Sequence, residues 1–168
     1  MLIALFVGDH NADIWPVRLG WWLTRVAQKG RFGDVTHCEA ILAGDASAAT
    51  IASSSVRDGG VRIKHRVQMN PEHWRIVDVP QWSAASAAQW FAQHMSQPYD
   101  WRGAWAIFLP GHHKSDSWFC NEAVGASVGL LEPHTFSPAV FAAACLSFGR
   151  EVTAEFFRTK SIEGNPSK

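Results

Sequence analysis

The chain has 168 residues, of which 47% are hydrophobic and 18% are charged, and its formal net charge is zero. This composition predicts one folded domain with its own core and excludes a disordered chain. Lysine and arginine form no cluster, so no nucleic-acid partner is expected. The three cysteines are odd in number and irregularly spaced, which excludes a disulfide framework and favours a reducing compartment.

The N-terminal half of the chain alternates apolar runs with turn residues. Such runs predict strands at residues 2–7, 35–43, 49–56, 61–67 and 74–79. After the first strand, Asp13 can cap a helix over residues 14–28, whose apolar side chains recur at helical spacing. The Gly44-Asp45 turn joins the second and third strands as a hairpin, so we expect a mostly antiparallel sheet.

The first apolar run, at residues 2–7, is too short for a signal peptide or a membrane-spanning helix. It also lacks a basic lead and a cleavage site. We therefore expect a cytoplasmic protein without a transmembrane segment.

The C-terminal half is predominantly helical. Ser83 caps a helix that runs to about residue 96, and Ser137 with Pro138 begins a last helix that runs to about residue 146. Between them, residues 102–116 are predicted as a long loop with room for one helical turn, and a helix follows from Cys120 to about residue 131. The pattern predicts a single α+β domain over residues 1–160 and a polar tail over 161–168.

Cys120 is the candidate nucleophile. It stands in the first turn of its predicted helix, where the positive end of the helix dipole favours the reactive thiolate. His37 lies on the strand over residues 35–43, on the same face as Glu39 and Ile41. If the Cys120 helix packs on this face, thiol and imidazole meet as in papain-like thiol enzymes. The structural alternatives are an inert core thiol and a half-buried strand histidine.

A set of short motifs accompanies these two residues. In chain order they are Thr36-His37 on a strand, Gly59-Gly60-Val61 after a hairpin, Pro98-Tyr99-Asp100-Trp101, Cys120-Asn121-Glu122 on a late helix, and Ser137-Pro138-Ala139. Their order and spacing, over residues 35–146, resemble the circularly permuted branch of the NlpC/P60 superfamily. That branch includes the YiiX/YaeF-like proteins and, more distantly, the lecithin:retinol acyltransferase-like proteins. The pattern is also similar to bacteriophage and prophage proteins of this branch.

This resemblance implies a papain-like fold and a thiol hydrolase or acyl transferase. Cys120 is then the nucleophile and His37 the base, and Tyr99 helps to orient the thiol or the substrate. Trp101 and Glu122 would join Tyr99 at the substrate-binding site, although a carboxylate in the first turn also stabilises a helix for purely structural reasons. Neither a cofactor nor a metal is expected.

The third catalytic group departs from the family pattern, which places a histidine, amide or carboxylate on the strand paired with the histidine strand. Pairing across the Gly44-Asp45 turn brings Ser53 or Ser54 opposite His37, and serine is a weaker orienter of an imidazole. Glu39 is the next candidate, and its structural alternative is a half-exposed strand carboxylate.

Three functions remain open from the sequence. The first is a cysteine hydrolase that cleaves an amide bond through a thioacyl intermediate, with a cell-wall peptide as the favoured substrate. The second uses the same two residues on a lipid ester or thioester, with the N-terminal helix, Trp101, Trp105 and Phe108 lining an acyl groove. The third is a non-catalytic phage structural or assembly module. The oligomeric state stays open.

Overall fold

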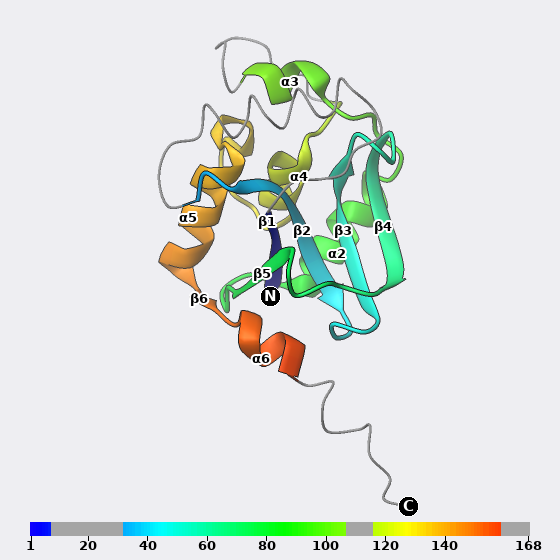
Figure 1. Ribbon diagram of the computed structural model, residues 1–168. Helices are drawn as coiled ribbons and strands as arrows, with labels where there is room; N and C mark the ends of the chain where they lie inside the picture. Colours follow the sequence, from blue (N-terminus) through cyan, green and yellow to red (C-terminus); the bar gives the residue numbers. More distant parts are fainter. Residues whose placement is uncertain (8–31, 107–115, 159–168) are drawn as a thin grey trace, which may run out of the picture.

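The computed structural model describes residues 1–7, 32–106 and 116–158, with a six-stranded sheet flanked by helices (Figure 1). The strands are β1 (Leu2–Val7), β2 (Val35–Ala43), β3 (Ala49–Ser55), β4 (Gly60–Val67), β5 (Trp74–Asp78) and β6 (Arg150–Glu151). Their order in the sheet is β4-β3-β2-β1-β5-β6, and each neighbouring pair is antiparallel. The predicted α+β class and antiparallel sheet are confirmed. The helix predicted over residues 14–28 and the tail at 161–168 lie outside the described residues.

The helices begin largely where the capping residues predict. They are α2 (Ala84–Gln93), α3 (Trp101–Ala106), α4 (Cys120–Ser127), the 3-10 helix η1 (Pro133–Thr135), α5 (Pro138–Phe148) and α6 (Thr153–Arg158). The Ser83 hydroxyl accepts the Ser86 N–H, and the Ser137 hydroxyl accepts the Val140 N–H, so both predicted caps are confirmed.

Several elements differ from the prediction. Helix α4 ends at Ser127, earlier than expected, because the chain turns at Gly129, which has a φ of +78°. The short helix α6 and strand β6 were not predicted from the sequence. In the segment predicted as a loop, α3 forms one short helix at residues 101–106.

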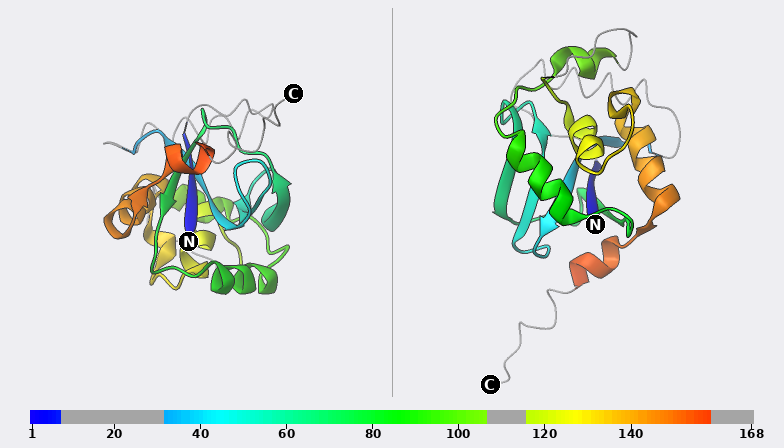
Figure 2. Two further views of the ribbon diagram at one scale, coloured as in Figure 1. Left: turned by 90° about the horizontal axis from the view of Figure 1, so that it is seen from below. Right: turned by 180° about the vertical axis from the view of Figure 1, so that it is seen from behind.

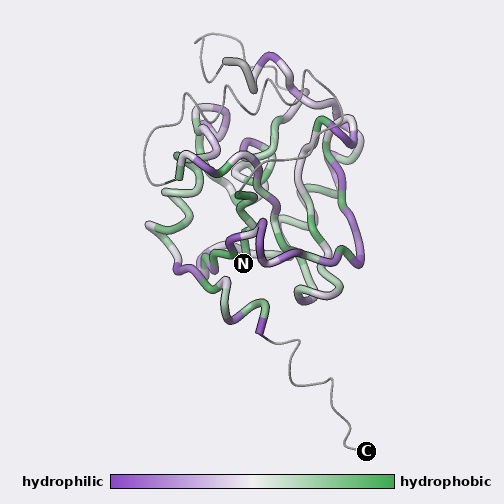
Figure 3. The backbone as a smooth tube through the Cα atoms, viewed as in Figure 1, coloured by the Kyte–Doolittle hydropathy of each residue, from purple (hydrophilic) through white to green (hydrophobic). Residues whose placement is uncertain are grey.

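The helices lie in two layers of unequal size. Helices α2, α4 and α5 cover one face of the sheet, and α6 lies on the other (Figure 2). The larger core lies under the first three helices, and the smaller one is closed by Phe156 and Phe157 of α6. Hydrophobic residues follow the central strands, whereas the edge strand β4 is hydrophilic along much of its length (Figure 3). Charged residues on an edge strand oppose pairing with another chain.

The sheet opens between β2 and β3 at the end that carries His37. The pairing of β2 with β3 extends only as far as Ala40 with Ala52, whereas β3 and β4 remain paired up to Ser55 with Gly60. In Figure 1 the two strands diverge at the top of the view, close to α4. On its other side, β2 has a bulge opposite the step from Phe6 to Val7. Bulges and open ends of this kind redirect side chains beside functional sites.

Candidate active site

Cys120 is the first residue of α4, as the sequence predicts. The carboxylate of Glu122 accepts the Phe119 N–H at 3.3 Å and thereby caps the first turn. The thiol is 5% exposed and lies between α4 and the sheet. The N–H groups of the first turn and the helix dipole favour a negative charge at this position.

Cys120 and His37 form an interacting pair. A hydrogen bond from Cys38, together with the charge and a hydrogen bond of His37, outweighs burial and holds the pKa of Cys120 well below its usual value. For His37, burial lowers the pKa, but the charge and hydrogen bond of Cys120, helped by Glu39, outweigh it and raise the pKa to about 9. Both shifts favour a thiolate on Cys120 and an imidazolium on His37.

The helix packs on a different face of β2 from the one expected. Cys38 and Ala40 share a core cluster with Cys120 and Val124 of α4, whereas Ile41 packs in the second cluster. The condition stated above, that α4 packs on the His37 face, is therefore not met. The pKa of His37 nonetheless responds to Cys120, and the bulge in β2 and the opening beside it lie at the end of the strand that carries His37.

Glu39 is the residue that orients His37. The His37 Nε2 donates to Glu39 Oε1 at 2.9 Å, and Glu39 is only 3% exposed. The structural alternative of a half-exposed strand carboxylate is therefore wrong. Burial raises the pKa of this carboxyl, but the hydrogen bond from His37 and the charge of Arg62 outweigh it and hold the pKa below its usual value. A buried carboxylate that stays ionised fixes both the ring orientation and the tautomer of a histidine.

The two serines proposed to lie opposite His37 do not orient it. The Ser53 hydroxyl donates to the Ser54 carbonyl at 3.4 Å, and the Ser54 hydroxyl donates to the Trp118 carbonyl at 2.6 Å. The expected register fails because β2 and β3 separate beyond Ala40 and Ala52. Ser54 instead links β3 to the segment that leads into α4.

Arg62 on β4 completes a chain of charges that the sequence analysis missed. Its guanidinium donates to both carboxylate oxygens of Glu39, at 2.7 Å from Nη1 to Oε2 and through Nη2 to Oε1. Its Nε donates to Asp58 Oδ2 at 2.9 Å, and the Lys64 Nζ lies 2.7 Å from the same oxygen. Arg62 pairs with Ser53, so it lies two strands from Glu39. A signal was present, because Asp58 and Arg62 flank the Gly59-Gly60 turn at a spacing that brings their side chains together.

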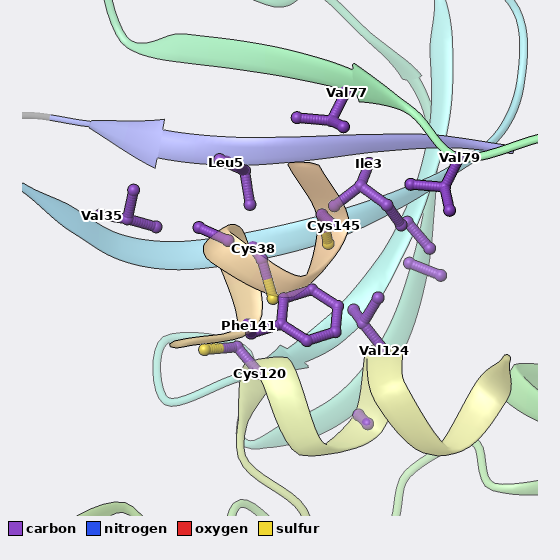
Figure 4. Close-up of a cluster of buried hydrophobic side chains, with 14 of the residues drawn as sticks. Ile3, Leu5, Val35, Cys38, Val77, Val79, Cys120, Val124, Phe141 and Cys145 are labelled. Carbon is purple, nitrogen blue, oxygen red and sulfur yellow. The ribbon is translucent and has the colours of Figure 1, made fainter. Parts of the chain in front are cut away.

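Cys38 was also missed. Its hydrogen bond is the largest influence that lowers the pKa of Cys120, and burial together with the Cys120 thiolate raises the pKa of Cys38 itself. Cys38 therefore remains a protonated thiol. Figure 4 shows both sulfur atoms in the space between β2 and the start of α4. The strand alternation had assigned Cys38 to the face opposite His37, and the packing of α4 on that face brings it to the site.

Tyr99 lies beside the thiolate. Its segment is held by a bridge to Trp118, and its N–H donates to the Gly59 carbonyl at 3.1 Å. Burial, followed by the negative charge of Cys120, raises the pKa of the phenol well above its usual value, so the hydroxyl stays protonated as a donor. The ring packs edge-on against Trp101 at 5.5 Å between centroids, and Trp101 is 45% exposed. These two predicted substrate-site residues are thus brought together.

Glu122 does not line a surface. It is fully buried, and burial, only partly opposed by the Phe119 N–H and reinforced by the charges of Asp100 and Cys120, raises its pKa to about 8. A side chain in this position cannot contact a substrate, so the predicted substrate-binding role is wrong. Its carboxyl group caps α4 from within the core.

Comparisons with known proteins find no counterpart. No family model matches the chain, and neither a curated protein nor a solved structure matches it. Within the described part of the chain, no helix is long and apolar enough to cross a membrane. In those same ranges, no group of three or more histidine, cysteine or acidic side chains could hold a metal ion, and residues 107–115, with their histidine pair, lie outside them.

Proposed function

We propose that this protein is a cysteine hydrolase that cleaves an amide bond, with Cys120 as the nucleophile and His37 as the general acid and base. The observation that carries the proposal is the buried chain from the Cys120 thiolate through His37 to Glu39, with the carboxylate 2.9 Å from the ring nitrogen. A thiolate at a helix N-terminus, an imidazolium and a polar group that fixes the imidazole are the three parts of papain-like catalysis, and here Glu39 is that polar group.

The proposed mechanism follows from the positions of these groups. The Cys120 thiolate attacks the carbonyl carbon, and the backbone N–H of Cys120 stabilises the developing oxyanion. Since Nε2 of His37 is held by Glu39, Nδ1 is the nitrogen that donates a proton to the leaving amine. Water then attacks the thioacyl group with His37 as its base, and the carboxylic acid product leaves. The protonated Tyr99 hydroxyl is a second donor at the site.

The proposed fold is a circularly permuted papain-like domain. Support comes from the order of the parts, because the histidine strand β2 precedes the nucleophile helix α4, and from the Pro98-Tyr99 segment that bridges to Gly60 and Trp118. A serine that oriented His37 only weakly would favour a non-catalytic module. The partner of His37 is instead the buried Glu39, so this reason does not apply. Buried charges are expensive to maintain, and such an arrangement is typical of a site that uses them.

A cell-wall peptide remains the favoured substrate, by resemblance to the permuted NlpC/P60 branch. The aromatic pair of Tyr99 and the exposed Trp101 offers a surface on which a peptide can pack. The lipid alternative relies on an acyl groove of which the N-terminal helix and Phe108 lie outside the described residues. Peptide and acyl substrates are therefore compared in the same assay.

The test combines thiol labelling with a substrate panel. Iodoacetamide should alkylate Cys120 near neutral pH much faster than a model thiol, and His37→Ala should slow that reaction by about tenfold or more, because the imidazolium no longer stabilises the thiolate. Hydrolysis of peptidoglycan fragments should be lost in Cys120→Ala and kept in Cys145→Ser, which alters a buried cysteine in α5. A Cys120 that reacts no faster than a model thiol would refute the proposal.

A further inference from the structure

All three cysteines of the chain converge on one core. Cys38 of β2, Cys120 of α4 and Cys145 of α5 belong to the same cluster of buried residues, and each is a free thiol (Figure 4). They come from three elements far apart in the sequence. The sulfur atoms of two of them, Cys38 and Cys120, lie in the space between β2 and the start of α4 (Figure 4).

These two sulfurs are chemically unequal. Cys120 begins a helix, faces an imidazolium and retains some exposure, so it holds the nucleophilic thiolate. Cys38 is fully buried in the strand, and burial keeps its thiol protonated. An oxidant from solvent therefore meets Cys120 first, and Cys38 is a neighbouring thiol in the same cluster.

We propose that Cys120 and Cys38 form an oxidation site at which a hydroperoxide converts the two thiols into a disulfide. This inference rests on the proposed function only in that both use the Cys120 thiolate. It adds a reversible way of removing the nucleophile, in which Cys38 is the resolving residue.

The reaction takes place in two steps. The Cys120 thiolate attacks one oxygen of the hydroperoxide and the O–O bond breaks, giving a sulfenic acid on Cys120 and an alkoxide that takes the His37 proton and leaves as an alcohol. The Cys38 sulfur then attacks the sulfenic sulfur, and the S–O bond breaks. The hydroxyl leaves with the Cys38 proton as water. The two thiol sulfurs are oxidised by two electrons in total, and the peroxide is reduced by two.

Cys38 also has a protective role in this scheme. A sulfenic acid without a neighbouring thiol proceeds to sulfinic acid, which thiol reductants do not reverse. With Cys38 in the same cluster, disulfide formation competes with that second oxidation. The nucleophile can then be recovered by reduction.

The test is hydrogen peroxide treatment of the whole chain followed by intact mass and peptide mapping under non-reducing conditions. Wild-type protein should lose about 2 Da, give a Cys38–Cys120 linked peptide, and return to three free thiols on addition of dithiothreitol. Cys38→Ser should instead trap sulfenic acid that reacts with dimedone and should progress to sulfinic acid. Cys145→Ser should behave as wild type.

Two results would overturn the inference. One is equal dimedone labelling of wild-type protein and Cys38→Ser without a linked peptide, and the other is a disulfide that maps to Cys145. Cys38→Ala, with its fold checked by circular dichroism, replaces the serine variant if that variant does not fold. Because the readout is mass, the outcomes separate: a disulfide in a protein that hydrolyses nothing refutes only the proposed function, whereas an active enzyme that forms none refutes only this inference.

Discussion

Substitution of Arg62 and substitution of Glu39 should move the pKa of His37 in opposite directions. In the native site Glu39 divides its charge between His37 and Arg62, and the pKa of His37 is about 9. In Arg62→Met the whole carboxylate charge acts on the imidazolium, so the pKa of His37 should rise further. In Glu39→Gln that charge is absent and the pKa should fall below about 9.

The structure also sets the expected change in the free energy of unfolding of Arg62→Met. Arg62 has a side chain that is 11% exposed, and Arg62→Met leaves the buried Glu39 carboxylate with one partner fewer, which should lower the free energy of unfolding by about 3 kcal/mol. Lys64→Met is the matched control, because Lys64 is on the same strand and also pairs with Asp58, but its side chain is 42% exposed. It should lower the free energy of unfolding by less than about 1 kcal/mol.

The assay is an NMR titration of the His37 ring together with urea unfolding. The double variant Arg62→Met/Glu39→Gln should be less destabilised than the sum of the single variants, because it buries no uncompensated carboxylate. The reasoning is refuted if Arg62→Met and Glu39→Gln shift the pKa of His37 in the same direction. Additive losses of stability would equally contradict it.

Three further predictions concern the surroundings of the pair. Cys38→Ala should raise the pKa of Cys120, measured as slower iodoacetamide labelling in mildly acidic buffer, because its hydrogen bond is the main stabiliser of the thiolate; labelling unchanged from wild type would contradict this. Gly60→Ala should lower the thermal unfolding temperature, because the added Cβ would lie 1.9 Å from a backbone carbonyl oxygen. Gly59→Ala is the control: its Cβ has open space, and its positive φ should lower the free energy of unfolding by only about 1 kcal/mol. The pKa of Glu122 is raised to about 8, so between about pH 4.5 and 8 the folded state keeps a proton that the unfolded state releases, and stability should fall as pH rises through this range. In Glu122→Gln this part of the pH dependence of stability should vanish. If it persists in the unfolding curves of that variant, the assignment is refuted.

Local features of the chain were predictable because local physics decides them. Apolar runs between turns correctly indicated five strands, and the hydroxyls of Ser83 and Ser137 marked two helix starts. The position of Cys120 in a first turn followed from the same short-range rules. Its encounter with His37 depended on a packing assumption that proved wrong in detail, since α4 covers the other face of β2.

The remainder of the site was decided by tertiary structure. Whether Glu39 is a surface carboxylate or a buried partner of His37 depends on Arg62, which arrives from β4, two strands away in the sheet. The role of Cys38 likewise depends on which face a helix from the other half of the chain covers. Sequence alone determined most of the elements and the two candidate catalytic side chains, since capping and periodicity act over a few residues. The separation of β2 from β3, and with it the third group of the site, came from long-range packing that no local pattern encodes.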